Sequence, residues 1–178
     1  MAFTPRTWVV GETVTAAQLN AEIRDQFNSR FLHARKTGDT GRTNATLADD
    51  PHLTVNIEAN ATYDLECFLI YRGASTGDFG AAFTVPAGTA GDWSLFGPDT
   101  ALAASAVTGS VRYNSGILTG TRIAGASDST TPVAAQGIGY VVAGSTAGPF
   151  TLKWAQVTTD ATATTLLTNS WMRLIRTS

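Results

Sequence analysis

The sequence has few of the side chains on which metal sites, disulfides and most catalytic centres depend. Its 178 residues include one cysteine, Cys67, and two histidines, His33 and His52. A single cysteine excludes an internal disulfide and a cysteine-based zinc cluster. Two isolated histidines are too few to bind a metal ion within one subunit, although one histidine could contribute to a site shared across a symmetry axis. We therefore expect no metal and no cofactor, and we interpret Cys67 as a small buried hydrophobic residue on a strand.

Charge and long apolar runs are also scarce. Charged residues make up 15% of the chain, lysine occurs only twice, and the formal net charge is −2. Non-specific nucleic-acid binding needs a basic surface, so this balance argues against a nucleic-acid partner. No apolar run approaches the roughly 18 residues of a transmembrane helix, and the N-terminus lacks the cationic and apolar regions of a signal peptide. We expect a soluble protein that is not exported and has no membrane partner.

Small and hydroxylated residues are abundant instead, and they suit short strands and tight turns. From about residue 44 the apolar residues recur at every second position, in runs parted by Gly, Pro, Asp and Ser. About eight or nine such runs predict a mainly β fold, an antiparallel β-sandwich or jelly roll. The last strand is expected to lie inside a sheet and to tie down the C-terminus. The expected strands cover residues 55–57, 63–71, 79–85, 93–95, 111–113, 117–123, 133–142, 150–157 and 171–176.

The strand expected at residues 63–71 has the most informative pattern. Asp64 and Glu66 lie on one face at its start, but Phe68 and Ile70 make the second half of that face apolar. A strand that is apolar on both faces is typical of a central strand or of an interface. The opposite face is apolar throughout and consists of Tyr63, Leu65, Cys67, Leu69 and Tyr71.

The only convincing helix is predicted at residues 15–28. Thr15 and Gln18 have the spacing of a capping box, and Val14 and Leu19 have that of a hydrophobic staple. Leu19, Ile23 and Phe27 recur every four residues and form a narrow apolar stripe. An isolated helix of this length is marginal in water, so the stripe needs a partner. We expect the helix to continue briefly through residues 31–36, which predicts an attachment arm at residues 1–36 and a β-sandwich at residues 37–178.

Short motifs that suggest catalysis lack the context they require. Residues 73–77 match G-x-S-x-G, but a strand is expected to follow and both histidines precede it, so a hairpin turn between glycines is favoured. Residues 78–80 copy a kinase triplet without its companion loops. Gly137 and Gly139 lack the third glycine of a dinucleotide motif and more simply allow close packing in a strand. Asp39 and residues 49–51 lack calcium-loop spacing and indicate turns. We expect no enzyme activity.

Residues 8–20 carry the pattern W-x-x-G-E-x-V-T-A-A-x-L-N, followed by Ile23-Arg24-Asp25. This segment resembles the N-terminal part of tail-associated and fibre-like virion proteins of tailed bacteriophages, particularly those that infect actinobacteria. The β-rich remainder is similar to that group at residues 63–71, 155–165 and 170–176, and trimeric knobs of the tumour-necrosis-factor-like or C1q-like type also end in an aromatic-aliphatic strand. The resemblance implies a virion structural protein, assembled in the host cytoplasm, that forms a homotrimer.

The resemblance leaves three functions open. A trimeric tail or tail-fibre protein would attach through its arm and turn its sandwich outward, with a host cell-surface glycan as a candidate partner beside other phage structural proteins. Trp93 and Tyr113 are candidate sugar-stacking residues, although a buried core position is favoured for each. The same trimer could instead decorate the capsid or form a head fibre. A carbohydrate-binding or hydrolysing sandwich would need paired carboxylates such as Asp64 and Glu66. The predicted assembly and attachment residues are Phe3, Trp8, Leu19, Ile23 and Phe27.

Overall fold

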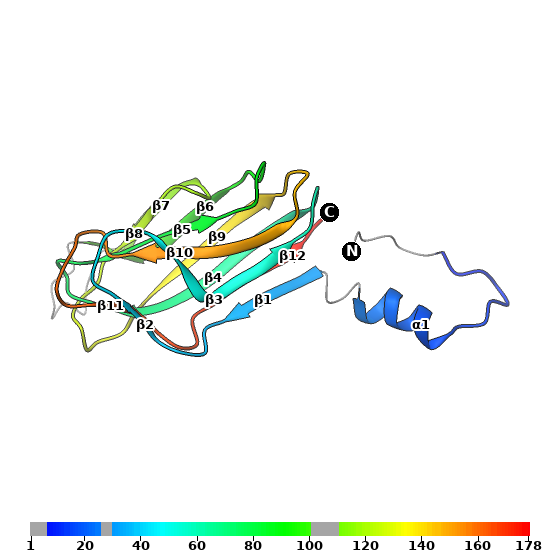
Figure 1. Ribbon diagram of the computed structural model, residues 1–178, viewed down its shortest axis with the longest axis horizontal. Helices are drawn as coiled ribbons and strands as arrows, with labels where there is room; N and C mark the ends of the chain where they lie inside the picture. Colours follow the sequence, from blue (N-terminus) through cyan, green and yellow to red (C-terminus); the bar gives the residue numbers. More distant parts are fainter. Residues whose placement is uncertain (1–6, 26–29, 101–110) are drawn as a thin grey trace.

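Two antiparallel β-sheets packed face to face form the body of the computed structural model, which describes residues 7–25, 30–100 and 111–178 (Figure 1). Two short helical elements, α1 (Ala16–Leu19) and the π-helix η1 (Asn20–Asp25), precede the strands. The strands are β1 (Phe31–Arg35), β2 (Thr40–Arg42), β3 (Ala48–Ile57), β4 (Thr62–Arg72), β5 (Phe79–Thr84), β6 (Asp92–Pro98), β7 (Val111–Ile117), β8 (Arg122–Ala124), β9 (Val133–Val142), β10 (Gly148–Ala155), β11 (Thr164–Leu166) and β12 (Trp171–Arg176).

The strand order is that of a jelly roll. The larger sheet has the order β1-β12-β4-β9-β6-β7, and the smaller sheet has the order β3-β10-β5-β8. If β2, β6, β7 and β11 are set aside, the remaining eight strands, renumbered along the chain, follow the orders 1-8-3-6 and 2-7-4-5. This alternation between two sheets is the double Greek key of a jelly roll. The predicted fold class, a mainly β antiparallel sandwich or jelly roll, is therefore confirmed.

A hairpin inserted between β5 and β8 widens the larger sheet. Its first strand, β6, pairs with β9, and its second strand, β7, forms the edge. The Asn114 side chain of β7 is hydrogen-bonded in both directions to Ile123 of β8, at 3.0 Å from Nδ2 to the carbonyl and 3.0 Å from the amide to Oδ1. Because β8 belongs to the smaller sheet, this amide ties the inserted hairpin to both layers.

The inner faces of both sheets fill one core. The apolar face predicted for residues 63–71 is confirmed, because all five of its side chains are buried on β4, the strand between β12 and β9. Phe83 of the smaller sheet stacks on Phe150 at 4.6 Å between ring centroids and meets Trp93 of the larger sheet edge-on at 4.8 Å. Such edge-to-face and offset pairs add to the free energy gained by burial alone. Among the described residues the buried cluster begins at Ala34 of β1, so α1 and η1 contribute nothing to the core.

The last strand holds the C-terminus inside the larger sheet, as predicted. β12 lies between β1 and β4 and pairs with both over most of its length. Beyond it, the Thr177 amide donates to the Thr62 carbonyl at 2.8 Å, and the Thr62 amide donates to the Ser178 carbonyl at 3.0 Å. The last strand therefore has a neighbouring strand on each side, and this pairing ties down the C-terminus.

The helical prediction is right at its start and wrong at its end. Thr15 caps α1 with the predicted capping box: its hydroxyl accepts from the Gln18 amide at 3.2 Å and its own amide donates to Gln18 Oε1 at 2.7 Å. The α-helix lasts four residues and passes into η1. Residues 31–35, expected to continue the helix, form β1, because their backbone pairs with β12. The chain thus enters the sheet before the expected boundary at residue 36, and the division into two domains stays a prediction.

Three further expectations are wrong in detail. The strand expected at 117–123 is interrupted, because the Gly120 amide turns back to the Ile117 carbonyl at 3.0 Å and residues 122–124 join the other sheet. Residues 73–77 connect the two sheets and are not a hairpin, although a strand does follow them. Residues 49–51 lie in β3 rather than in a turn. Strands β1, β2 and β11 were not expected, because they are short or carry weak alternation.

Close packing at the two glycines of β9, which the sequence favoured over a dinucleotide motif, generates a prediction. A Cβ atom on Gly139 would lie 2.4 Å from the Asp92 carbonyl oxygen and 2.7 Å from Trp93 Cβ. Gly139→Ala should therefore force β6 away from β9 and lower the free energy of unfolding by about 1–3 kcal/mol, as overpacking does. Gln136→Ala on the exposed side of the same strand is the matched control. Equal thermal stability of the two variants would contradict this packing.

Candidate functional site

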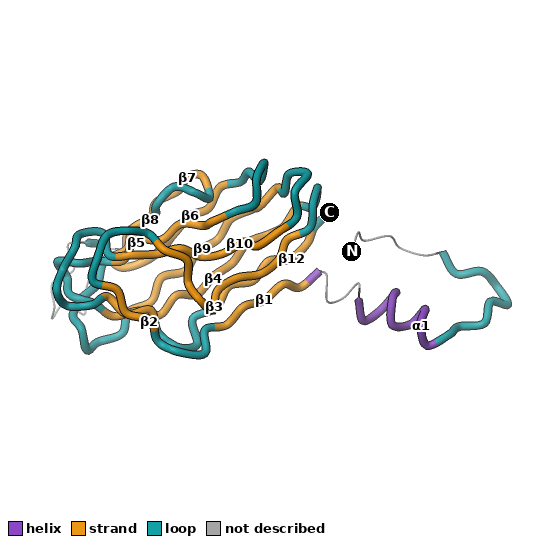
Figure 2. The backbone as a smooth tube through the Cα atoms, in the orientation of Figure 1, coloured by secondary structure: helices purple, strands orange, loops and turns teal. Residues whose placement is uncertain are grey.

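The predicted attachment residues that the structure describes are exposed. Trp8 and Leu19 are each 44% exposed and Ile23 is 63% exposed, whereas Phe3 and Phe27 lie outside the described residues. In Figure 2 the helical segment lies beside the sandwich and not between its sheets. The stripe of Leu19 and Ile23 therefore has no place in the core of its own chain, but what covers it stays a prediction.

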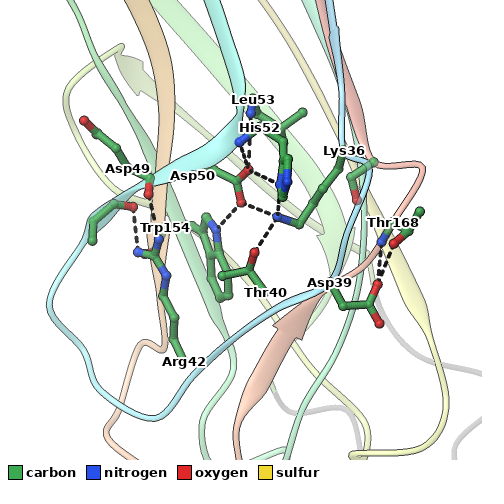
Figure 3. A network of polar contacts seen from close by, with 12 residues as sticks. Lys36, Asp39, Thr40, Arg42, Asp49, Asp50, His52, Leu53, Trp154 and Thr168 are labelled. Carbon is green, nitrogen blue, oxygen red and sulfur yellow. Dashed lines mark hydrogen bonds and ion pairs between the residues drawn. The ribbon is translucent and has the colours of Figure 1, made fainter.

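A buried ion pair links the end of β1 to the smaller sheet (Figure 3). Lys36 follows β1, and its Nζ lies 2.7 Å from Asp50 Oδ2 of β3, with both side chains fully buried. Lys36 also donates to the Thr40 hydroxyl at 2.7 Å and contacts His52 Nδ1 at 3.3 Å. Trp154 of β10 donates its indole N–H to the same Asp50 oxygen at 3.0 Å. We call Lys36, Thr40, Asp50, His52 and Trp154 the polar clasp.

Both oxygens of the Asp50 carboxylate accept hydrogen bonds. Asp50 Oδ1 accepts the backbone amides of His52 and Leu53 at 2.9 and 3.2 Å, while Oδ2 accepts from Lys36 and Trp154. Burial alone would raise the pKa of Asp50, but hydrogen bonds from Lys36, the His52 amide and Trp154 outweigh it and hold the pKa below its ordinary value. A buried charge is tolerated when every lone pair is satisfied in this way. The clasp is therefore a structural junction between the sheets.

Neighbouring polar residues close the same end of the sandwich. Arg42 donates to the carbonyls of Ala48 and Asp49 at 2.6 and 2.8 Å, and its guanidinium lies 4.5 Å from the centroid of the Trp154 ring. Asp39 accepts from the amide and hydroxyl of Thr168 at 2.7 and 2.8 Å. These contacts show why Asp39 and Asp50 are present: each carboxylate holds two distant segments together. The sequence did not predict this, because Lys36 was assigned to a helix and Asp50 to a turn.

The solvent side of the larger sheet is the side on which Glu66 and Phe68 of β4 lie, and we call it the outer face. It carries Tyr113, which is 61% exposed, so the core position favoured for this residue is wrong. Trp93 is 1% exposed, so the core position favoured for that residue is confirmed and it is no sugar platform. Residues directly opposite each other in antiparallel strands share a face. Phe68 therefore lies level with Trp171 and Gln136, and Gln136 lies level with Phe96.

Two shallow hollows of opposite charge indent the outer face. One, of about 520 Å³, is lined by the carboxylates of Asp64, Glu66 and Asp92 together with Ile138 and Tyr140. The other, of about 190 Å³, is lined by His33, Arg35, Trp171 and Arg173. Arg173 Nε donates to Glu66 Oε2 at 2.8 Å across the boundary between them. Of the carboxylates considered for glycoside chemistry, Glu66 is therefore held in an ion pair, while the described residues provide no hydrogen-bond partner for Asp64.

Cys67 and the histidines have the environments of structural residues. Cys67 is buried, and burial raises the pKa of its thiol to about 12, which keeps it protonated and apolar as the sequence indicated. His33 stacks on Trp171 at 6.3 Å between ring centroids, and His52 belongs to the clasp through its contact with Lys36. Within residues 7–25, 30–100 and 111–178, no three His, Cys, Asp or Glu side chains gather as they would around a metal ion. In the same part of the chain no helix is long and apolar enough to cross a membrane.

Comparison with known proteins gives only distant likenesses. No family model and no curated protein matches the sequence. Among solved structures, Eiger TNF from S. frugiperda is similar with a TM-score of 0.38 and 12% identity, over 83% of this chain and 92% of that chain. The tripod from the baseplate of bacteriophage Tuc2009 is similar with a TM-score of 0.28 and 12% identity, over 98% of this chain and 75% of that chain. The VP2 subviral particle of infectious bursal disease virus has a TM-score of 0.20 at 10% identity, over 83% and 39%. Because all three TM-scores lie below 0.5, these likenesses do not decide the function of this chain.

The clasp predicts a large loss of stability when one partner is removed. Lys36→Met should lower the free energy of unfolding at pH 7 by about 3–5 kcal/mol, because it leaves the Asp50 carboxylate buried without its counter-ion. The double variant Lys36→Met/Asp50→Asn should be much less destabilised, since no uncompensated charge remains. Urea unfolding of the three proteins checks this. A single variant as stable as the wild type would contradict the clasp.

The lowered pKa of Asp50 also predicts the sign of a pH effect. A carboxyl group whose pKa is lower in the folded state stabilises the fold above the unfolded value of about 3.9, and this stabilisation is lost as the pH falls through the folded value. The difference in unfolding free energy between the wild type and Lys36→Met/Asp50→Asn should therefore shrink as the pH is lowered from about 5 to about 2, a range that contains the unfolded pKa of about 3.9. Urea titrations at several pH values measure it; a difference that grows on acidification would contradict the assignment.

Proposed function

We propose that this chain is a structural protein of a bacteriophage virion, of the minor tail or tail-fibre type, that forms a homotrimer and attaches through residues 1–36. The observation that carries the proposal is the N-terminal segment. Its residues 8–20 resemble the attachment segments of phage tail-associated proteins, and its helix exposes Leu19 and Ile23 although the sandwich core is complete without them. Exposed apolar groups on a separate element are typical of a surface that assembles with another protein.

The sandwich fits a role in which shape and contacts matter more than chemistry. Its charged side chains in the clasp and in the Glu66–Arg173 pair form ion pairs with one another. In this proposal the chain has no catalytic residue, and its partners are other copies of itself and other virion proteins. A homotrimer with closed symmetry would cover apolar side chains that a single copy leaves in water.

A charge placed on the stripe tests the attachment role. Ile23→Asp should abolish incorporation of the protein into particles, because a carboxylate would have to be buried without a partner. Ala21→Asp adds the same charge two residues away, off the predicted stripe, and is the matched control. Incorporation is measured by complementing a phage that lacks the gene and quantifying the protein in purified virions. Full incorporation of Ile23→Asp would show that the stripe does not attach the protein.

Immunogold labelling of particles that carry an epitope-tagged chain tests the location. The proposal predicts label at the tail. Label over the head would overturn the tail assignment in favour of a capsid decoration or head-fibre protein. Tagged protein that is expressed but absent from purified particles would overturn the virion role altogether.

A further inference from the structure

The two sheets differ in what they expose to solvent. Within residues 7–25, 30–100 and 111–178, every exposed large hydrophobic side chain belongs either to the segment before β1 or to the larger sheet. The corresponding side of the smaller sheet exposes polar groups, such as Thr54 and Asn56 on β3. A one-sided concentration of apolar residues of this kind marks an interaction surface and not a random scatter of exposed side chains.

Aromatic residues are aligned across the outer face. Trp171 and Phe68 lie side by side on β12 and β4, with ring centroids 6.4 Å apart. Phe96 and Tyr113 lie side by side on β6 and β7, with centroids 4.8 Å apart. Gln136 of β9 lies level with both pairs, so four aromatic rings form one row across the sheet. Aromatic residues are enriched at the energetic centres of protein interfaces.

The charges of the outer face are separated into two halves. The half formed by β1 and β12 carries Arg35 and Arg173, and the half that extends from β4 to β6 carries Asp64, Glu66 and Asp92. Arg173 is already paired with Glu66 within the chain. Arg35 on one half and Asp64 on the other have no partner among the described residues, and each lines the hollow of its own sign. Each half thus presents charge that the other half would complement.

We infer that the outer face is the contact between copies of this chain, with the β1–β12 half of one copy packed on the β4–β6 half of the next. This inference rests on the proposed homotrimer and names the surface that makes it. Because the two halves differ, the contact is heterologous and joins unlike surfaces of neighbouring copies. In an open row of copies each terminal copy has one uncovered half, and closure of the row into a ring covers it. A closed ring covers both halves of every copy, and the aromatic row becomes part of a shared apolar centre.

A second copy fits this surface better than other classes of partner. Nucleic-acid binding requires a positively charged surface, whereas the larger hollow on this face is acidic. A membrane surface with anionic lipids would likewise be repelled by Asp64 and Asp92. A face that carries both signs on separate halves, with an apolar row across both, is complementary to itself.

The first test places a charge in the aromatic row. Phe68→Asp should raise the dissociation constant of the assembly at least about tenfold, measured by sedimentation equilibrium of the purified full chain, because it buries an unpaired carboxylate at the contact. Asn56→Asp adds the same charge to the exposed side of the smaller sheet and should leave assembly unchanged. Circular dichroism verifies that both variants fold. Equal weakening by both variants, or no weakening by Phe68→Asp, would overturn the inference.

The second test reverses charges and does not depend on the apolar row. Arg35→Glu and Asp64→Lys should each weaken assembly, because each sets like charges against each other across the contact. The double variant carries both reversals in every copy and should recover assembly at least partly. Absence of recovery, with both single variants weakened and folded, would overturn the arrangement of opposite halves.

Failure of this inference can be distinguished from failure of the proposed function. A purified chain that remains a monomer but is incorporated into virions would overturn the contact between copies and leave the virion role supported. A purified chain that forms a ring through the outer face but is absent from virions would support the contact and overturn the virion role.

Discussion

Burial of one face of β4 between the two sheets is the interaction on which the rest of this structure depends. The strand lies at the centre of the larger sheet, and its inward side chains from Tyr63 to Tyr71 contact the smaller sheet across the core. Because successive residues of a strand point to opposite sides, fixing this register also fixes the other face. Phe68 must then face outward, even though it is apolar. The core thus determines which apolar residues of the strand remain exposed.

The polar clasp solves a different problem, which is how to join the edges of the two sheets. Lys36 and Asp50 come from the ends of β1 and β3, which belong to different layers, and Trp154 of β10 completes the site. An ion pair buried this deeply gives little net stability compared with apolar packing, but loss of one partner leaves the other charge buried and is strongly destabilising. The clasp therefore fixes how the chain passes from β1 to β3. The stretch between them, with Asp39 bound to Thr168 and Arg42 beside Trp154, is held by the same kind of directed contact.

Elements were predicted correctly from the sequence where the physical signals are local and repeated. The alternation of residues 63–71 predicted β4 and its buried face, and Thr15 with Gln18 predicted the start of α1. Prediction failed where partners are distant in the chain. Phe31–Arg35 read as helix because pairing with β12 is invisible before the fold is known, and Asp50 read as a turn residue because its counter-ion lies fourteen positions away. The exposure of Tyr113 could not be predicted, since short strands such as β7 do not reveal which side faces a partner.

We propose that the exposed helix and the outer face serve one assembly. Among the described residues none before β1 belongs to the buried core, residues 8–20 resemble an attachment segment, and the outer face carries opposite charges on its two halves. The most direct measurement is a cryo-electron microscopy map of the virion at a resolution that shows β-strands. We predict three copies around a threefold axis at the tail, with the larger sheets facing that axis and the arms in contact with the particle. Single copies, or copies whose smaller sheets face the axis, would contradict this prediction.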